Sequence, residues 1–272
     1  MINAGENKMN FLVIDHVSHT YLTRQSAVTA LENISFTIEE GEFVSFLGPS
    51  GCGKTTLLSI IAALIKPTEG TVLLEGNKID SINRSVGYML QQDYLFPWKT
   101  IEENIFLGLK IMGIDTSKAK QKALNLLSEI GLKGVEKHYP HQLSGGMRQR
   151  AALVRTLATN PKILLLDEPF SALDYQTKLK LEELVWKTLK DYNKTALLVT
   201  HDIGEAIAMS DRIFLFAARP GRLVNTFVIP EELRSLSPFA ARQHPRFSEL
   251  FQSIWKELDQ LETDRPSHST PS

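Results

Sequence analysis

Apolar residues alternate with polar ones, or form short runs, at many places along the chain. Such patterns predict β-strands over residues 11–17, 31–38, 43–47, 71–74, 86–90, 163–166, 196–200, 211–216 and 223–229. Apolar spacings of three and four predict helices over residues 57–65, 101–109, 123–130, 147–158, 179–189 and 247–258. The run 163–166 is apolar at every position, which is typical of a central parallel strand buried on both faces. The pattern therefore predicts an α/β core with a helical subdomain inserted at about residues 93–158.

The two ends of the chain differ from this core. Residues 1–10 are polar and are expected to fray, and residues 263–272 are polar and rich in Pro and Ser, as in disordered segments. The amphipathic pattern in the C-terminal extension, residues 236–262, favours a helix packed on the core over a special role in binding a partner. We place the core domain at residues 11–235.

Composition narrows the possible classes. The chain has 272 residues with 43% hydrophobic and 22% charged, which is ordinary for a globular protein. A net charge of −1 argues against a bulk nucleic-acid binder. Cys52 is the only cysteine, so an intrachain disulfide is impossible, in keeping with a reducing cytosol. The longest apolar run, 57–65, is far shorter than the ~20 residues of a membrane span, and the N-terminus lacks a signal-peptide core, so we expect a chain that does not cross the membrane.

A glycine-rich loop lies between the predicted strand 43–47 and the predicted helix 57–65. It fits the phosphate-binding pattern G-x-x-x-x-G-K-[ST] and reads Gly48-Pro49-Ser50-Gly51-Cys52-Gly53-Lys54-Thr55-Thr56. The glycines let backbone N–H groups point at phosphate oxygens, and the helix N-terminus adds partial positive charge. Lys54 is expected to reach the β- and γ-phosphates, and the Thr55 hydroxyl to ligate Mg²⁺. The alternative, a plain turn before a helix, is disfavoured because motif and context agree.

Two acids follow the buried run 163–166. Asp167 stands at the strand end, where a phosphate-loop protein holds Mg²⁺, usually through water. Glu168 is placed to polarise an attacking water. Alone, an acid pair at a strand end could be a solvated turn; together with Lys54 and Thr55 it predicts a nucleotide-hydrolysing site.

Further motifs, in order and at matching spacing over about residues 11–230, resemble those of ABC ATPases. Leu143-Ser144-Gly145-Gly146-Met147-Arg148-Gln149 resembles their signature motif and Leu166-Asp167-Glu168-Pro169 their Walker B box. Ser171-Ala172-Leu173-Asp174 resembles the D-loop. Gln91 matches the Q-loop glutamine, His201 the switch histidine and Tyr21, which we expect in a polar turn, the aromatic that stacks on adenine. Gln92 departs from the many relatives that carry an acid there.

The resemblance implies a fold and an assembly. The fold is the P-loop NTPase core of ABC ATPases with an N-terminal antiparallel β part. Ser144 is expected to cap a helix whose first N–H groups, exposed by Gly145 and Gly146, form a second anion site. In the family, this site and Asp174 meet the ATP held by the other protomer of a head-to-tail homodimer. His201 would contact the γ-phosphate, and Gln91 the Mg²⁺ site.

Weaker cues resemble the ATP-binding subunits of nitrate, sulfonate and taurine importers. They are Leu95-Phe96-Pro97-Trp98 after the Q-loop, Ala218-Arg219-Pro220-Gly221-Arg222, and the short chain. This implies an ATPase on the cytoplasmic side of the membrane, energising separate permease subunits and, indirectly, a solute-binding protein. Phe96 and Trp98 are a candidate anchor for the permease, unless they only pack the helical insert. The solute is read by other subunits.

Two other classes remain as alternatives. An ABC protein of repair or translation is disfavoured because the signature follows Thr55 without a coiled-coil insertion and the chain holds one cassette. A small-molecule phosphate-loop kinase does not explain the signature and the D-loop. Cys52 could be reactive at a helix N-terminus, but a backbone role is the simpler interpretation.

Overall fold

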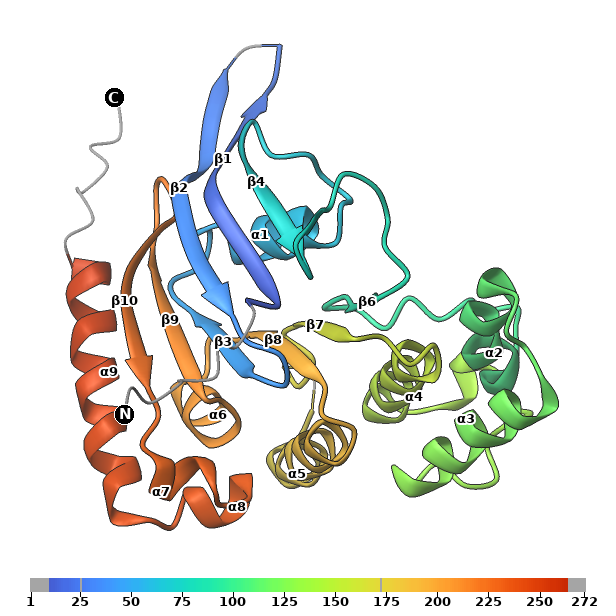
Figure 1. Ribbon diagram of the computed structural model, residues 1–272. Helices are drawn as coiled ribbons and strands as arrows, with labels where there is room; N and C mark the ends of the chain where they lie inside the picture. The colour runs from blue at the N-terminus through green and yellow to red at the C-terminus, as the bar shows by residue number, and fades with distance from the viewer. Residues whose placement is uncertain (1–9, 25, 172, 264–272) are drawn as a thin grey trace, which may run out of the picture.

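The computed structural model describes residues 10–24, 26–171 and 173–263. It shows an antiparallel sheet stacked on a larger, mostly parallel sheet, with helices covering the far face of the latter (Figure 1). The predicted frayed N-terminus and disordered C-terminal tail lie almost wholly outside the described residues, as does Ala172 of the D-loop.

The smaller sheet has the strand order β2-β1-β4-β5 and is antiparallel throughout. Its strands are β1 (Leu12–Leu22), β2 (Ala27–Ile38), β4 (Glu69–Leu74) and β5 (Asn77–Lys78). The expectation that Tyr21 lies in a polar turn was wrong. Strand β1 continues to Leu22, and Tyr21 pairs with Val28 of β2. Register shifts between Ile14 and Thr20 interrupt the alternation that would have revealed the full strand length.

The larger sheet has the order β10-β9-β3-β8-β7-β6, and all its pairs are parallel except β10 with β9. Its strands are β3 (Phe43–Leu47), β6 (Val86–Met89), β7 (Ile163–Asp167), β8 (Thr195–Val199), β9 (Arg212–Ala217) and β10 (Arg222–Val228). Every residue of β3, β7 and β8 is buried, which explains why these strands are apolar at nearly every position. Because these strands are parallel, their carboxyl ends lie at one edge of the sheet, which is where phosphate-loop proteins bind nucleotide.

Aromatic side chains fill the space between the two sheets. The Phe36 ring of β2 lies 5.6 Å from that of Phe46 and 4.7 Å from that of Phe214, measured between centroids. Helix α1 (Lys54–Ile61) completes this core. It is shorter than the helix predicted over 57–65 because Ala63 adopts a left-handed backbone, φ 57°, which ends the helix.

Helices α4 (Gly145–Ala158) and α5 (Tyr175–Asp191) cover the other face of the parallel sheet (Figure 1). Together with α4, helices α2 (Ile101–Met112) and α3 (Ser117–Glu129) form the predicted helical insert, which ends before α5. Helices α2 and α3 pack on α4, whose buried face joins them to the core. Thr100 and Glu103 form a capping box that fixes the start of α2.

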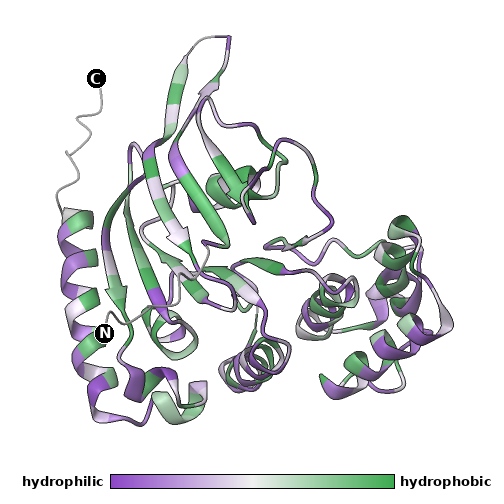
Figure 2. Ribbon diagram, in the orientation of Figure 1, coloured by the Kyte–Doolittle hydropathy of each residue, from purple (hydrophilic) through white to green (hydrophobic). Residues whose placement is uncertain are grey.

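The C-terminal segment wraps around the edge of the molecule near β10 (Figure 1). It consists of α7 (Glu231–Arg234), α8 (Pro238–Ala241) and α9 (Pro245–Thr263), which pack on α6 (Ile203–Met209) of the core. Figure 2 shows hydrophilic and hydrophobic residues alternating along α9. Ile254, on the face of α9 that packs on the core, is fully buried in a hydrophobic cluster to which α6 also contributes. Packing of this helix on the core is thus confirmed. None of the helices in the described part of the chain is long and apolar enough to span a membrane.

Candidate functional site

The phosphate loop joins the end of β3 to the start of α1, as the sequence predicted. Gly48 and Gly53 are required by their surroundings. A Cβ on Gly48 would lie 2.5 Å from the Phe216 carbonyl oxygen, and one on Gly53 would lie 2.8 Å from that of Ala30. Gly53 also has φ 85°, a backbone that only glycine adopts without strain. The two glycines therefore let the loop pass close to the backbone of Phe216 and Ala30.

Lys54 lies against the loop that precedes it. Its Nζ donates hydrogen bonds to the carbonyl oxygens of Gly48, at 2.7 Å, and Pro49, at 3.0 Å, and lies 3.3 Å from Cys52 Sγ. The side chain is nearly buried, and Cys52 is fully buried. Both hydrogen-bond partners of this amine are neutral carbonyl oxygens, which phosphate oxygens can replace. Burial of the thiol agrees with a backbone role for Cys52.

The acidic strand end and the phosphate loop meet side by side. The Thr55 hydroxyl donates to Asp167 Oδ1 at 3.2 Å. Burial raises the pKa of Asp167 above its ordinary value, and the adjacent Glu168 carboxylate adds to this effect. A hydroxyl and a carboxylate beside a phosphate site are hard oxygen donors of the type that Mg²⁺ prefers. The residues present thus fit a magnesium ion.

Glu168 stands out for its backbone. It has φ 47°, the left-handed region that non-glycine residues rarely occupy, and its N–H is tied to the Val199 carbonyl oxygen at 2.9 Å. Such strain recurs at functional sites, where surrounding contacts enforce it. The conformation places a partly exposed carboxylate at the rim of the cavity.

Gln91 and His201 approach this carboxylate from two other elements. Gln91, just after β6, donates from Nε2 to Glu168 Oε2 at 3.0 Å, while His201 Nδ1, just after β8, lies 3.5 Å from Oε1. Together with residues 50–56, these three side chains line a cavity of about 530 Å³. The structure thus brings the predicted lysine, threonine, glutamine, glutamate and histidine to one pocket.

The signature motif lies elsewhere. Ser144 caps α4, as predicted: its hydroxyl accepts from the Met147 N–H at 3.3 Å. Neither Ser144 nor Gly145 nor Gly146 lines the phosphate cavity. Arg148 Nε donates to Asp93 Oδ2 at 2.9 Å, which ties the signature helix to the segment after Gln91. The phosphate cavity and the signature motif of one chain are therefore separate, and the Arg148–Asp93 ion pair joins the signature helix to the segment after Gln91.

Two other predicted residues take defined positions. The Tyr21 hydroxyl lies 3.2 Å from the Thr56 hydroxyl, and its half-exposed ring lies edge-on to His19. Tyr21 therefore flanks the loop, and its contact with adenine stays a prediction. Asp174 caps α5: its side chain accepts from the Thr177 N–H at 3.0 Å, and bonds from this residue hold the carboxyl pKa below its ordinary value.

Sequence reasoning missed several residues around the site. Ala30 and Val199 line the phosphate cavity through positions that carry no motif. A second cavity of about 140 Å³ lies on the other side of Glu168 and His201, and Lys178 and Glu205 line it. The only available signals were that Lys178 follows the D-loop by one helical turn and that Glu205 follows His201.

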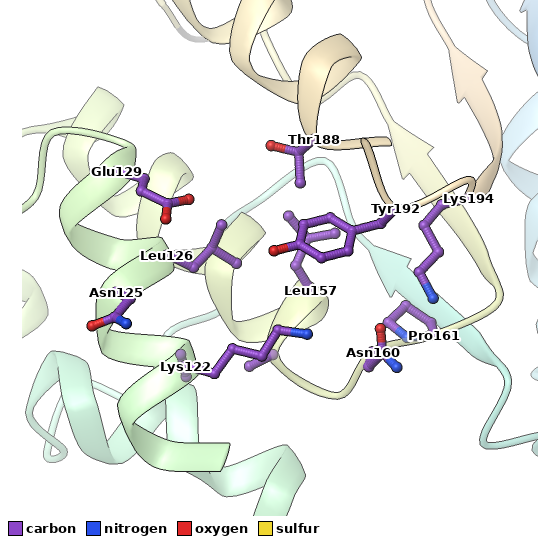
Figure 3. Close-up of a pocket in the computed structure, with 12 residues that line it drawn as sticks. Lys122, Asn125, Leu126, Glu129, Leu157, Asn160, Pro161, Thr188, Tyr192 and Lys194 are labelled. Atoms are coloured by element: carbon purple, nitrogen blue, oxygen red, sulfur yellow. The ribbon is translucent and has the colours of Figure 1, made fainter. Parts of the chain in front are cut away.

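Another pocket lies between the insert and α5, away from these motifs (Figure 3). The Lys122 ammonium lies 4.9 Å from the centre of the Tyr192 ring, and Lys194 lines the opposite part of the pocket. Burial, with Lys122 and Lys162 nearby, lowers the pKa of Lys194. None of the predicted site residues lines this pocket, so it does not belong to the nucleotide site.

The fold and the loop–acid–histidine pocket define a P-loop NTPase that carries a separate signature helix. The sequence model of the ABC transporter family matches residues 31–171. The chain belongs to that family. An ABC transporter ATP-binding protein of Bacillus subtilis (strain 168), YtlC, is 64% identical over 260 residues, covering 96% of this chain and 100% of the relative.

Other relatives carry more specific names. The taurine import ATP-binding protein TauB of Escherichia coli (strain K12) is 40% identical, covering 81% of this chain and 89% of TauB. An aliphatic sulfonates import ATP-binding protein, SsuB of Bacillus cereus, is 40% identical, covering 90% of this chain and 93% of SsuB. The dimeric post-hydrolysis structure of the ATP-binding cassette MJ0796, bound to ADP and Pi, superposes with a TM-score of 0.73 at 36% identity, covering 80% of this chain and 99% of that one.

Proposed function

We propose that this chain is the ATP-hydrolysing subunit of an importer for a small organic or inorganic anion, of the taurine, sulfonate or nitrate type. One observation carries the proposal. The phosphate loop and the triad Gln91, Glu168 and His201 line one cavity, while the signature Ser144 caps a helix outside it. A site divided in this way needs a second copy to become complete.

Binding of the nucleotide uses the loop and its lysine. The backbone N–H groups of residues 50–56 and the N-terminus of α1 receive the phosphates, and Lys54 exchanges its carbonyl partners for the β- and γ-phosphate oxygens. Thr55, Asp167 and Gln91 would hold Mg²⁺, and the bound metal would neutralise charge on the phosphates. Tyr21 offers its ring to the adenine.

Hydrolysis depends on the three groups that converge at the rim. Glu168 accepts a hydrogen bond from the attacking water and orients it toward the γ-phosphorus. His201, within 3.5 Å of this carboxylate, contacts the γ-phosphate and holds the water between the two groups. The 3.0 Å hydrogen bond from Gln91 Nε2 holds the Glu168 carboxylate in this orientation. The strained backbone of Glu168 restricts its carboxylate to this position.

Dimer closure joins the two kinds of site. In a head-to-tail homodimer, Ser144, Gly145 and Gly146 of one protomer meet the ATP of the other, near Asp174. ATP then favours the closed dimer because its phosphate is contacted from both sides only in that state. The dimeric form named for the MJ0796 cassette supports this arrangement.

Coupling to a permease uses the segment after Gln91. Tyr94 and Trp98 have large side chains that are exposed there, Trp98 by 69%. Phe96 lies beside Trp98, with ring centroids 5.4 Å apart. Exposed aromatics anchored on a fixed loop suit a partner helix. The subunit would therefore sit on the cytoplasmic side of the membrane, bound to permease subunits. A solute-binding protein would deliver the solute to those permeases.

A growth experiment tests the importer. A host whose only copy of the gene carries Lys54→Ala should lose uptake of taurine, an alkanesulfonate or nitrate, measured with labelled solute. Growth on sulfate and ammonium should be unchanged. Normal uptake of all three anions in this strain would reject the proposed solute class. The names TauB and SsuB, both import proteins, favour this class over repair or translation.

A further inference from the structure

Five ionisable side chains form a cluster behind Glu168 and His201, and all of them are largely buried except Asp202, whose side chain is 43% exposed. We call it the switch network; it consists of Lys178, Glu182, Asp202, Glu205 and Arg242. The cluster joins three elements that pack on one another, helices α5, α6 and α8 (Figure 1). The exposed fraction is zero for the Glu182 side chain and 4% for that of Glu205. Buried charges at this depth need partners, and each partner here comes from a different part of the chain.

Lys178 is the shared cation of the network. Its Nζ lies 2.8 Å from Asp202 Oδ2, 3.0 Å from Glu205 Oε2 and 3.9 Å from Glu182 Oε1. It stands one helical turn after Asp174, and its N–H bonds to the Asp174 carbonyl oxygen. The ammonium therefore links the helix that starts at the D-loop to the residue that directly follows His201.

The loop that carries His201 is held on both sides by this network. The Thr200 hydroxyl donates to Glu205 Oε2 at 2.9 Å and accepts from the Asp202 N–H at 3.0 Å. Asp202 also caps α6 by accepting from the Glu205 N–H at 3.0 Å. No network atom touches the imidazole itself in the described contacts. The position of His201 is thus set through its two neighbours.

Arg242 extends the network to the C-terminal segment. Arg242 directly follows helix α8, and its guanidinium lies 2.8 Å from Glu182 Oε2. Both Glu182 oxygens lack a well-aligned hydrogen bond, so this ion pair is their main compensation. Removing the arginine would leave a buried carboxylate facing Glu205, which is a costly arrangement.

The charges do not balance. Three carboxylates face two cations, and the charged groups acting on Glu182 are Arg242, Glu205, Lys178 and Asp202. Burial raises the pKa of Glu182 to about 7, against the effect of Arg242. Loss of either cation would add repulsion that pushes α5, α6 and α8 apart.

We propose that Lys178 and Arg242 are positioning residues for His201, which hold its loop through the buried carboxylates of the switch network. Because Arg242 belongs to the C-terminal segment, that segment sets the rate of hydrolysis without contact with nucleotide. The inference rests on the proposed role of His201 in hydrolysis.

The test compares ATP hydrolysis by the purified full chain, under multiple and single turnover. Lys178→Met and Arg242→Met should each lower kcat by about tenfold, which is less than the ~10²-fold loss typical of removing an acid–base group itself, with KM for ATP changed less than about twofold. Lys178→Arg and Arg242→Lys should recover most of kcat. Arg246→Met is the matched control, because Arg246 forms an exposed ion pair with Glu232 in the same segment, and it should leave both parameters unchanged.

A double-mutant cycle separates this inference from the proposed function. In a His201→Ala background, Lys178→Met and Arg242→Met should cause little further loss, because they act through the histidine. Full additivity would overturn the positioning role. If His201→Ala alone does not slow hydrolysis, the proposed role of His201 fails, and the inference fails with it; a slow His201→Ala with unaffected Arg242→Met rejects the inference alone.

A second variant keeps the test decisive should the single variants unfold. Replacing both members of a buried pair by apolar residues commonly preserves stability. Glu182→Leu with Arg242→Leu should therefore melt near wild type and still hydrolyse ATP more slowly at unchanged KM. A wild-type kcat in this folded double variant would contradict the proposal.

Discussion

Gln91 and Glu168 are joined by a 3.0 Å hydrogen bond across 77 positions of sequence. The same glutamine offers its carbonyl oxygen to Gln149 of the signature helix at 3.4 Å. Gln91 thus connects Glu168, the signature helix α4 and the exposed segment that leads to Trp98.

Lys54→Ala tests the phosphate loop. The alanine removes the ammonium that faces the phosphates, and also its bonds to the Gly48 and Pro49 carbonyl oxygens. We expect loss of ATP binding or turnover, measured by nucleotide fluorescence and phosphate release, with thermal unfolding close to wild type. Hydrolysis at the wild-type rate would show that the loop is wrongly assigned.

Phe96→Ala combined with Trp98→Ala tests the docking segment. Trp98 is 69% exposed, and neither ring belongs to the buried core of the insert, so the fold should tolerate both changes. Basal ATPase of the isolated subunit should be nearly unchanged, whereas co-purification with the permease and solute-stimulated ATPase should fall together. Ile111→Ala, at an exposed apolar position on α2, serves as the control. A double variant that assembles and couples normally would place the docking surface elsewhere.

Glu182 should make stability depend on pH. Its pKa rises from 4.5 in the unfolded chain to about 7 in the fold, so between these values the folded state binds more protons. Stability therefore falls as pH rises from about 4.5 to about 7 and levels off above that. Melting scans of wild type and Glu182→Gln should diverge over this window, with the glutamine variant losing less; each 1 kcal/mol corresponds to roughly 2–4 °C. Glu249→Gln, at a side chain 75% exposed, should follow wild type, and identical profiles for all three would refute the assignment.

The sequence predicted those parts of the site that depend on local chemistry. The strand–loop–helix context fixed the phosphate loop, and the apolar run before Asp167 identified the central strand. Ser144 was predicted as a cap because serine is a preferred residue directly before the first turn of a helix. These features need only neighbours along the chain.

Other parts could not be predicted because their causes are distant in sequence. Helix α5 starts at Tyr175, four residues before the apolar pattern, because the Asp174 cap stabilises a polar first turn. Strand β1 extends through Tyr21 because β2 pairs with it. Lys178 forms an ion pair with Asp202, which lies 24 positions further along the chain, and the spacing of apolar residues does not predict such a contact.

The most direct test is to measure the molecular mass of the Glu168→Gln variant in solution with Mg²⁺ and ATP. The glutamine keeps the side-chain shape but cannot orient water as a carboxylate does, so hydrolysis should slow by at least ~10²-fold while ATP stays bound. Light scattering after sizing should then show a monomer without nucleotide and a dimer with ATP. Ser144→Arg added to this variant should abolish the dimer, since the signature would no longer reach the second nucleotide. A chain that stays monomeric with ATP while Glu168→Gln hydrolyses it at the normal rate would contradict the account.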